Sequence, residues 1–315
     1  MKILEHLPDN HIIKKRIEYC DNPIFNKNNF VPIKGGSFIM GALKPEELDA
    51  FAKLKNWIAD DILIDNEAGS DENPHKVNLS DFSMNKYAIT NAEYAEFLTI
   101  YGSDKVKRGV YKDNDLIDEN WFGIEKNNGI WQPASSIYTN FPINKVSWFG
   151  ANEFCEFWGL QLPTESQWEY AARSGGKNIK YSWGNDIPNT ENNQKFGNIA
   201  DEALKNAYSS QITTYTEGYN DGYSVTAPVD AFTANELELY QMSGNVYEWC
   251  ADWYGSYPND DEVANDPAGA LTSSNRVLRG GSWRNPLFNC RVANRNHDAP
   301  GSRNSDIGFR PVLVP

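Results

Sequence analysis

The sequence predicts a single α+β domain with little regular secondary structure. Three helix-start signals lie between residues 90 and 164, short alternating apolar segments precede them, and the second half is dominated by Asn, Asp, Gly, Tyr and Trp. Of the 315 residues, 40% are hydrophobic and 23% are charged, which is typical of a globular protein with a sizeable core. We find no fixed-period repeat and no linker, so we expect residues 31–315 to form one domain behind an irregular arm at residues 1–30.

Four segments before residue 90 have patterns that predict local structure. Residues 31–41 alternate around a Gly-Gly pair, which predicts a hairpin edge. Residues 44–60 predict a helix, because a proline suits the first turn and apolar residues recur on one face. Residues 65–73 are acidic and predict a loop, whereas the alternation over residues 77–89 predicts strands.

Three later segments carry helix-start signals. Thr90 and Glu93 stand three positions apart ahead of an apolar run, as in a capping box. Ser147 precedes a second segment with apolar residues at helical spacing. Thr164 and Gln167 repeat the capping box and predict a third helix, which ends before a Gly-Gly pair.

The remaining segments are less regular. Residues 102–140 contain many Asn, Asp and Gly residues, which predicts a long insertion without regular elements. From Tyr181 onward the apolar runs are brief, so we expect short elements joined by loops. The chain has ten Trp, sixteen Tyr and fifteen Phe residues, and these favour an aromatic core because aromatic side chains bury large areas.

Charge and hydropathy exclude several classes of function. The net charge of −14 opposes binding to nucleic-acid phosphates and to anionic membrane surfaces. No window approaches the roughly 18 apolar residues of a membrane span, so we expect no membrane insertion. The first residues do not resemble a signal peptide, and the four cysteines show no Cys-x-x-Cys spacing. We therefore expect a reducing, cytoplasmic location.

Short strings recur along the chain in a fixed order. They lie at residues 35–41, 87–94, 142–148, 162–173, 227–229, 243–249, 276–283 and 307–310. In this order and at these spacings they resemble the formylglycine-generating, or sulfatase-modifying-factor, family over nearly the whole chain. The resemblance implies a variant of the C-type lectin fold, with a small twisted antiparallel sheet and a core rich in aromatic residues.

The resemblance also implies a copper site in catalytic members, made by two cysteines five residues apart. By position the second is Cys290, but the first is Asn285. A lone thiolate does not complete the two-coordinate soft-ligand site that Cu(I) favours. Iron-using relatives need histidines in a His-x-x-x-His arrangement, which is not formed by His6, His11, His75 and His297. We expect neither copper nor iron.

Structural Ca²⁺ is a further implication of the resemblance. The first expected ligand set is Asn198, Ile199, Asp221 and Tyr223. The second is Gln241, Gly244, Val246 and Glu248. Oxygen atoms from side chains and carbonyls suit a hard cation, although Gln241 is longer than the Asn that the family usually carries. The alternative is that hydrogen bonds alone hold these loops.

The C-terminal segment at residues 283–306 has a distinct composition, in which Asn recurs among Asp, His, Ser, Gly, Arg, Leu and Phe. Base changes at the adenines of an Asn codon produce this set. The segment resembles the variable region of diversity-generating retroelement proteins, and an ordinary Asn-rich loop is the alternative. The residues that we expect to bind a ligand are Trp283, Arg284, Asn285, Leu287, Phe288, Asn289, Asn294, Asn296, His297, Asp298, Gly301, Ser302, Asn304, Ser305 and Asp306.

The leading hypothesis is a non-catalytic binding protein whose C-terminal loops recognise a protein or a surface ligand. A rigid scaffold can carry exposed side chains that change without disturbing the core. The alternative is a formylglycine-generating-like oxidoreductase, or another enzyme of the family that uses the pocket under Ser282. A structural subunit of a larger assembly is a third reading.

Overall fold

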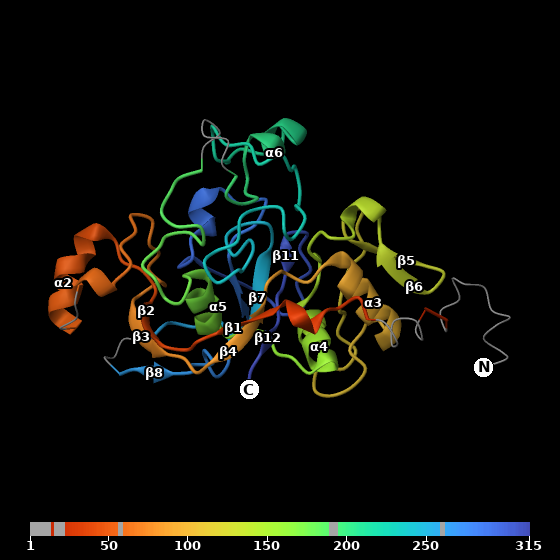
Figure 1. The fold of residues 1–315 in the computed structure, drawn as a ribbon, viewed down its shortest axis with the longest axis horizontal. Helices are drawn as coiled ribbons and strands as arrows, with labels where there is room; N and C mark the ends of the chain where they lie inside the picture. The colour runs from red at the N-terminus through yellow and green to blue at the C-terminus, as the bar shows by residue number, and fades with distance from the viewer. Residues whose placement is uncertain (1–13, 16–22, 56–58, 189–194, 259–261) are drawn as a thin grey trace.

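Short helices and strands joined by long loops make up the fold (Figure 1). The computed structural model describes residues 14–15, 23–55, 59–188, 195–258 and 262–315. None of the described helices is both long and apolar enough to cross a bilayer. The α-helices are α2 (Pro45–Lys55), α3 (Asn91–Tyr101), α4 (Trp148–Trp158), α5 (Glu165–Ala172) and α6 (Glu202–Ala207), and the 3-10 turns are η2 (Lys27–Asn29), η3 (Ala59–Asp61), η4 (Ser136–Tyr138) and η5 (Leu287–Cys290). The strands are β1 (Phe30–Ile33), β2 (Ser37–Met40), β3 (His75–Asn78), β4 (Phe82–Asn85), β5 (Ile124–Asn127), β6 (Ile130–Pro133), β7 (Tyr247–Trp253), β8 (Ala264–Asn265), β9 (Arg276–Arg279), β10 (Arg295–Asp298), β11 (Ile307–Gly308) and β12 (Val312–Leu313).

The largest described sheet has the order β10-β9-β7-β11. β9 pairs antiparallel with both β7 and β10, and β11 lies parallel to β7. β4 pairs antiparallel with β1 and β12, so segments from both ends of the chain meet in one sheet. Figure 1 places α2 at one end of the molecule and the β5–β6 hairpin at the other, with the largest sheet between them. The predicted α+β class with small, mainly antiparallel sheets is confirmed.

The three helix-start predictions are also confirmed. Before α3, the Thr90 hydroxyl accepts the N–H of Glu93 at 3.2 Å, and the Glu93 carboxylate accepts the N–H of Thr90 at 2.8 Å. Ser147 caps α4, and Thr164 with Gln167 forms a second capping box at α5. Each cap satisfies backbone N–H groups that the first turn of a helix leaves unpaired.

Aromatic side chains fill the interior between the helices and the largest sheet. The ring of Phe154 on α4 lies 5.3 Å from the rings of Phe97 on α3 and Phe309 before β12. Trp168 of α5 is fully buried, and its indole N–H donates to Glu248 of β7 at 2.7 Å. These contacts hold α5 against β7, where the C-terminal segment also packs.

The predicted hairpin over residues 31–41 is wrong. β1 pairs with β4 whereas β2 pairs with β3, so the two strands belong to different sheets. A Cβ atom on Gly35 would stand 2.1 Å from the carbonyl oxygen of Leu79. The glycine therefore permits a close approach between two backbone segments, and it does not form a hairpin turn.

The prediction that residues 102–140 lack regular elements is wrong in part. β5 and β6 form a hairpin around Asn128 and Gly129, whose φ angles are 50° and 82°. Asn-Gly between strands is a strong hairpin signal that composition alone obscures. Trp131 of β6 is buried, and its N–H donates to the Thr99 hydroxyl of α3 at 3.1 Å. The hairpin thus closes the core beside α3.

Two predictions fall partly outside the described residues. The helix predicted over residues 44–60 is present as α2 up to Lys55, and residues 56–58 are not described. Most of the expected arm at residues 1–30 is likewise not described. Within it, Phe25 is buried in the aromatic core, with its ring 5.3 Å from that of Phe154.

Candidate functional site: the C-terminal surface and its supports

The segment after β9 begins with a tight glycine turn. Gly280 and Gly281 have φ angles of 97° and 71°, a region that strains other residues. A Cβ atom on Gly281 would also stand 2.5 Å from the Cys290 sulfur. The turn therefore packs directly on η5 and carries Ser282 toward residues 285–290.

An amide occupies the position that the family resemblance assigns to the first copper ligand. The Ser282 hydroxyl contacts Oδ1 of Asn285 and lies 3.0 Å from the Asp306 carboxylate. Cys290 is 0% exposed, and burial raises the pKa of its thiol to about 12. Such a thiol is protonated near neutral pH, whereas the thiolate is the metal ligand. These residues do not fit a two-thiolate copper site.

The expected recognition residues do not all face solvent. Trp283 is only 7% exposed, and its indole N–H donates to the carbonyl of Ser305 at 3.3 Å. Trp283 is therefore part of the aromatic core that the sequence favours, and it does not belong to the exposed binding surface. The exposed members of the set are Arg284, Phe288, His297, Gly301 and Asn304. The half-buried members are Asn285, Leu287, Asn289, Asn294, Asn296, Asp298, Ser302, Ser305 and Asp306.

Hydrogen bonds hold the loop after β10 in one shape. The Asp298 carboxylate accepts bonds from the Ser302 hydroxyl at 2.6 Å and from the Asn304 amide at 2.9 Å. Arg303 donates to Asp118 at 2.9 Å and so ties the loop to the segment before β5. A surface with a fixed backbone loses less entropy when it binds a partner.

Buried arginines anchor the C-terminal segment from below. Arg291 donates to both oxygens of Glu72, at 2.9 and 2.8 Å, and to Asp65 at 2.9 Å. Arg295 binds both oxygens of Glu165, at 2.7 and 2.9 Å. Sequence reasoning missed these supports because each pair is separated by at least 130 positions. The acidic residues in the segment 65–73 were the sequence signal that could have indicated partners for these arginines.

The four residues expected at the first calcium site lie together. Asp221 accepts the N–H of Ile199 at 3.1 Å and the N–H of Tyr223 at 2.7 Å. Oδ1 of Asn198 is buried and has no hydrogen-bond partner among the described residues. Burial, and then the charge of Asp201, raises the pKa of Asp221 above its ordinary range. The unpaired amide oxygen of Asn198 fits a hard cation, whereas both carboxylate oxygens of Asp221 already accept backbone N–H groups.

At the second expected site, a guanidinium already neutralises the carboxylate. Arg310 donates to both oxygens of Glu248, at 2.8 and 2.7 Å, and Trp168 adds a third bond at 2.7 Å. The Gln241 amide donates to a backbone carbonyl at 2.6 Å. The second set therefore does not fit calcium, because its single carboxylate has a cationic partner. In the described part of the chain no group of three His, Cys, Asp or Glu side chains could hold a metal ion, so a cation at either place would also need amide and carbonyl oxygens.

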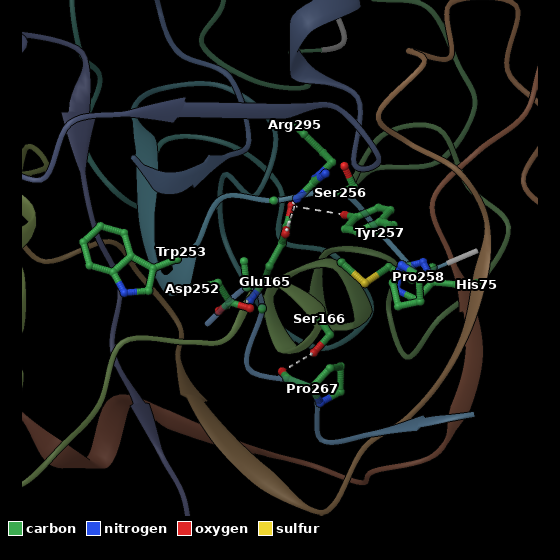
Figure 2. A pocket seen from close by; sticks show the side chains of 14 residues that line it. His75, Glu165, Ser166, Asp252, Trp253, Ser256, Tyr257, Pro258, Pro267 and Arg295 are labelled. Atoms are coloured by element: carbon green, nitrogen blue, oxygen red, sulfur yellow. Dashed lines mark hydrogen bonds and ion pairs between the residues drawn. The ribbon is translucent and has the colours of Figure 1, made fainter. Parts of the chain in front are cut away.

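A separate cavity of about 140 Å³ lies at the N-terminal end of α5 (Figure 2). Figure 2 shows Arg295 and Tyr257 directed at the Glu165 carboxylate, with Asp252 near the start of the helix. His75 lies beside Tyr257, and the two ring centroids are 4.3 Å apart. No local sequence pattern predicts this cavity, because β3, α5, β7 and β10 each contribute to its wall.

The fold and the C-terminal segment together define a lectin-like domain of the formylglycine-generating type. The chain matches the family described as "Sulfatase-modifying factor enzyme 1-like domain" over residues 18–314, and it belongs to that family. It is 32% identical over 312 residues to the formylglycine-generating enzyme of Thermomonospora curvata, covering 90% of this chain and 93% of that protein. The family predicted from the sequence strings is thereby confirmed.

Two further relatives differ in how much of their length is shared. The serine/threonine-protein kinase pkn1 of Chlamydia caviae is 29% identical over 313 residues, which cover 98% of this chain but 41% of that protein. The chain thus spans about two fifths of the kinase. Treponema denticola variable protein 1 aligns with a TM-score of 0.58 at 22% identity, over 91% of this chain and 95% of that one. That likeness confirms the predicted fold.

Proposed function

We propose that this chain is a non-catalytic binding protein that presents its C-terminal loops as a recognition surface. The observation that supports the proposal is that Asn285 stands where catalytic relatives have the first copper-binding cysteine. Asn285 holds its amide oxygen against Ser282, and the remaining thiol at Cys290 is buried and protonated. Without a second thiolate, residues 282–290 lack the ligands of an oxidase and retain the loops of the scaffold.

The chemistry of the recognition surface is mixed. Arg284, Phe288, His297 and Asn304 are exposed, and they offer a cation, an aromatic ring, an imidazole and an amide. Aromatic and arginine side chains contribute strongly to binding when a partner buries them. The partner is a protein or a surface ligand that such a mixed surface complements.

Structural calcium would support the same surface through the first ligand set. The N–H of Ala200, which directly follows Ile199, donates to the carbonyl of Asn285 at 2.9 Å. A cation held by Asn198 and Asp221, with backbone carbonyls, would stiffen this connection. Its role would be to fix loops, since the site lies under the surface and both side chains are buried.

Copper retention tests the non-catalytic part of the proposal. The protein is loaded with Cu(I) under anaerobic reducing conditions, excess metal is removed, and bound copper is counted by mass spectrometry. We expect well under one equivalent for the native chain. Asn285→Cys is the matched variant, because it restores a second cysteine five residues before Cys290. One equivalent of copper in the native chain, lost in Cys290→Ser, would contradict the proposal.

A peptide selection tests the recognition part. Peptides selected from a displayed library on the native protein are re-measured against a variant with Arg284, Phe288, His297 and Asn304 all changed to Ala. We expect binding to fall at least tenfold. A control variant carries four Ala substitutions at exposed positions on α2 and the β5–β6 hairpin, and it should bind as the native protein does. Equal binding by both variants would contradict a C-terminal recognition surface.

A further inference from the structure

The cavity at the N-terminal end of α5 contains a carboxylate without a positive partner. Two buried carboxylates line the cavity, Glu165 at 4% and Asp252 at 3% exposure. Arg295 neutralises Glu165 through two hydrogen bonds. Oδ2 of Asp252 accepts the N–H of Glu165 at 2.8 Å, but no Lys, Arg or His of the described chain forms an ion pair with Asp252. Asp252 therefore lacks a direct ion-pair partner among the described residues, whereas Glu165 has Arg295 and also Arg279 at 3.6 Å.

The other charged groups near Asp252 have different partners. Arg276 of β9 is held between the rings of Trp148 and Trp253, with its guanidinium carbon 3.8 and 3.5 Å from their centroids. It donates to a backbone carbonyl and to a tyrosine hydroxyl. The His75 ring lines the cavity, but burial lowers its pKa and keeps it neutral near pH 7. Neither side chain supplies the missing positive charge.

The size and walls of the cavity restrict what can enter it. A cavity of about 150 Å³ can hold a molecule the size of benzene, so the volume of about 140 Å³ suits roughly six non-hydrogen atoms. Hydroxyl groups come from Ser166 and Ser256. Much of the remaining wall is apolar, contributed by Met40, Trp253, Pro258, Pro267 and Ala270. The occupant must combine one polar end with a short apolar body.

The number of unpaired oxygen atoms in the cavity indicates which cationic group the ligand carries. Calcium requires six to eight oxygen ligands, and the cavity has one unpaired carboxylate. A guanidinium group binds a carboxylate best through two parallel hydrogen bonds, but the backbone of Glu165 already occupies one oxygen of Asp252. An ammonium group is a compact charge that can bind the remaining carboxylate oxygen without a paired geometry, and the cavity wall offers it hydroxyl oxygens from Ser166 and Ser256 as further acceptors.

We propose that this cavity binds a primary ammonium group on a short aliphatic chain, with Asp252 as its counter-ion. Met40 and the two prolines contact the aliphatic chain, and Ser166 and Ser256 share the remaining ammonium hydrogens. The ammonium comes either from a free small amine or from a lysine side chain that a partner inserts. The inference is independent of the proposed C-terminal recognition surface, because it rests on cavity residues outside the exposed set.

Calorimetric titration of the full chain at pH 8 with n-butylammonium chloride tests this site. We expect one equivalent to bind and n-butanol, which has the same chain without the charge, to bind at least tenfold more weakly. Asp252→Asn retains an acceptor for the Glu165 N–H and removes the charge, so it should weaken butylammonium binding at least tenfold. Asp81→Asn is the matched control, because Asp81 is an exposed aspartate paired with Lys34, and this variant should bind as the native chain does.

A second variant separates loss of binding from loss of folding. Ala270→Leu fills the cavity from the wall without altering a carboxylate, and it should also abolish binding while the tryptophan fluorescence stays native-like. The proposal is overturned if butylammonium does not bind, if potassium chloride at equal ionic strength gives the same heat, or if both cavity variants bind like the native chain. Nα-acetyl-lysine methylamide distinguishes the two sources. Binding of this probe supports a lysine side chain, and binding of butylammonium alone supports a free amine.

The pH dependence of binding gives a further readout. Burial, and then the charge of Glu165, raises the pKa of Asp252 to about 7. The butylammonium ion is protonated throughout this range, so affinity should rise by about tenfold between pH 6 and pH 8 as Asp252 ionises. Among the other facing groups, Arg295 and Arg276 stay charged, burial raises the pKa values of Tyr257 and the Cys250 thiol, and burial lowers the pKa of His75. Affinity that does not change with pH would contradict the role of Asp252.

Discussion

Replacing the buried Arg291 by Met should destabilise the protein severely. Arg291 is buried, and it donates the two hydrogen bonds that neutralise Glu72. Asp65 keeps another partner, because Lys180 lies 3.0 Å from its carboxylate. The variant therefore leaves one buried carboxylate, Glu72, with no cation. Breaking a buried pair in this way costs about 3 to 5 kcal/mol of the free energy of unfolding.

Guanidinium denaturation monitored by tryptophan fluorescence measures this loss. The double variant Arg291→Met with Glu72→Met should recover most of it, because a buried ion pair replaced by apolar side chains of similar volume is often neutral or stabilising. Lys34→Met is the control, since it removes an exposed pair at 2.8 Å and should leave the midpoint nearly unchanged. A loss below about 1 kcal/mol for Arg291→Met, or no recovery in the double variant, would refute the reasoning.

Three further outcomes are expected. Burial raises the pKa of Glu93 to about 7, so its folded state binds a proton that the unfolded state releases above about pH 4. Stability relative to Glu93→Gln should consequently fall by on the order of 3 kcal/mol from pH 4 to pH 7 and then level off, and a flat difference in thermal or chemical unfolding would contradict this. Cys290 should resist alkylation by iodoacetamide at pH 8 until denaturant is added, as peptide mass spectrometry would show, because its thiol is buried with a pKa of about 12. Gly281→Ala should lower the unfolding midpoint by more than Gly301→Ala, because only the first has a positive φ and a sulfur at 2.5 Å; equal midpoints would exclude the proposed strain.

Local chemistry explains which parts of the fold the sequence predicts. The caps at Thr90, Ser147 and Thr164 act within three residues, so a single sequence reveals them. Strand pairing is non-local, and the wrong hairpin at residues 31–41 arose because alternation marks a strand without naming its partner. Asn128-Gly129 shows that a local signal can also be overlooked inside a polar segment.

The candidate sites also divide into those that the sequence predicts and those that depend on contacts between distant residues. The four residues expected at the first calcium site lie together, whereas the neutralisation of Glu248 by Arg310 depends on residues 62 positions apart. The cavity around Asp252 requires the packing of β2, β3, α5, β7 and β10, so no spacing in the sequence predicts it. Trp283 shows the limit for surfaces, because a residue among exposed neighbours can still point inward.

In the C-terminal segment, buried side chains hold the backbone and exposed side chains face solvent, and this separation has an evolutionary consequence. The side chains of Arg291 and Arg295 point inward and hold the backbone, whereas Arg284 and Phe288 are exposed and do not belong to these supports. Substitutions at exposed positions away from such supports usually change stability by no more than about 0.5 kcal/mol each. Changing Arg284 and Phe288 together would then cost at most about 1 kcal/mol if the two effects add. The segment can thus drift neutrally through many sequences while the molecule keeps the same fold.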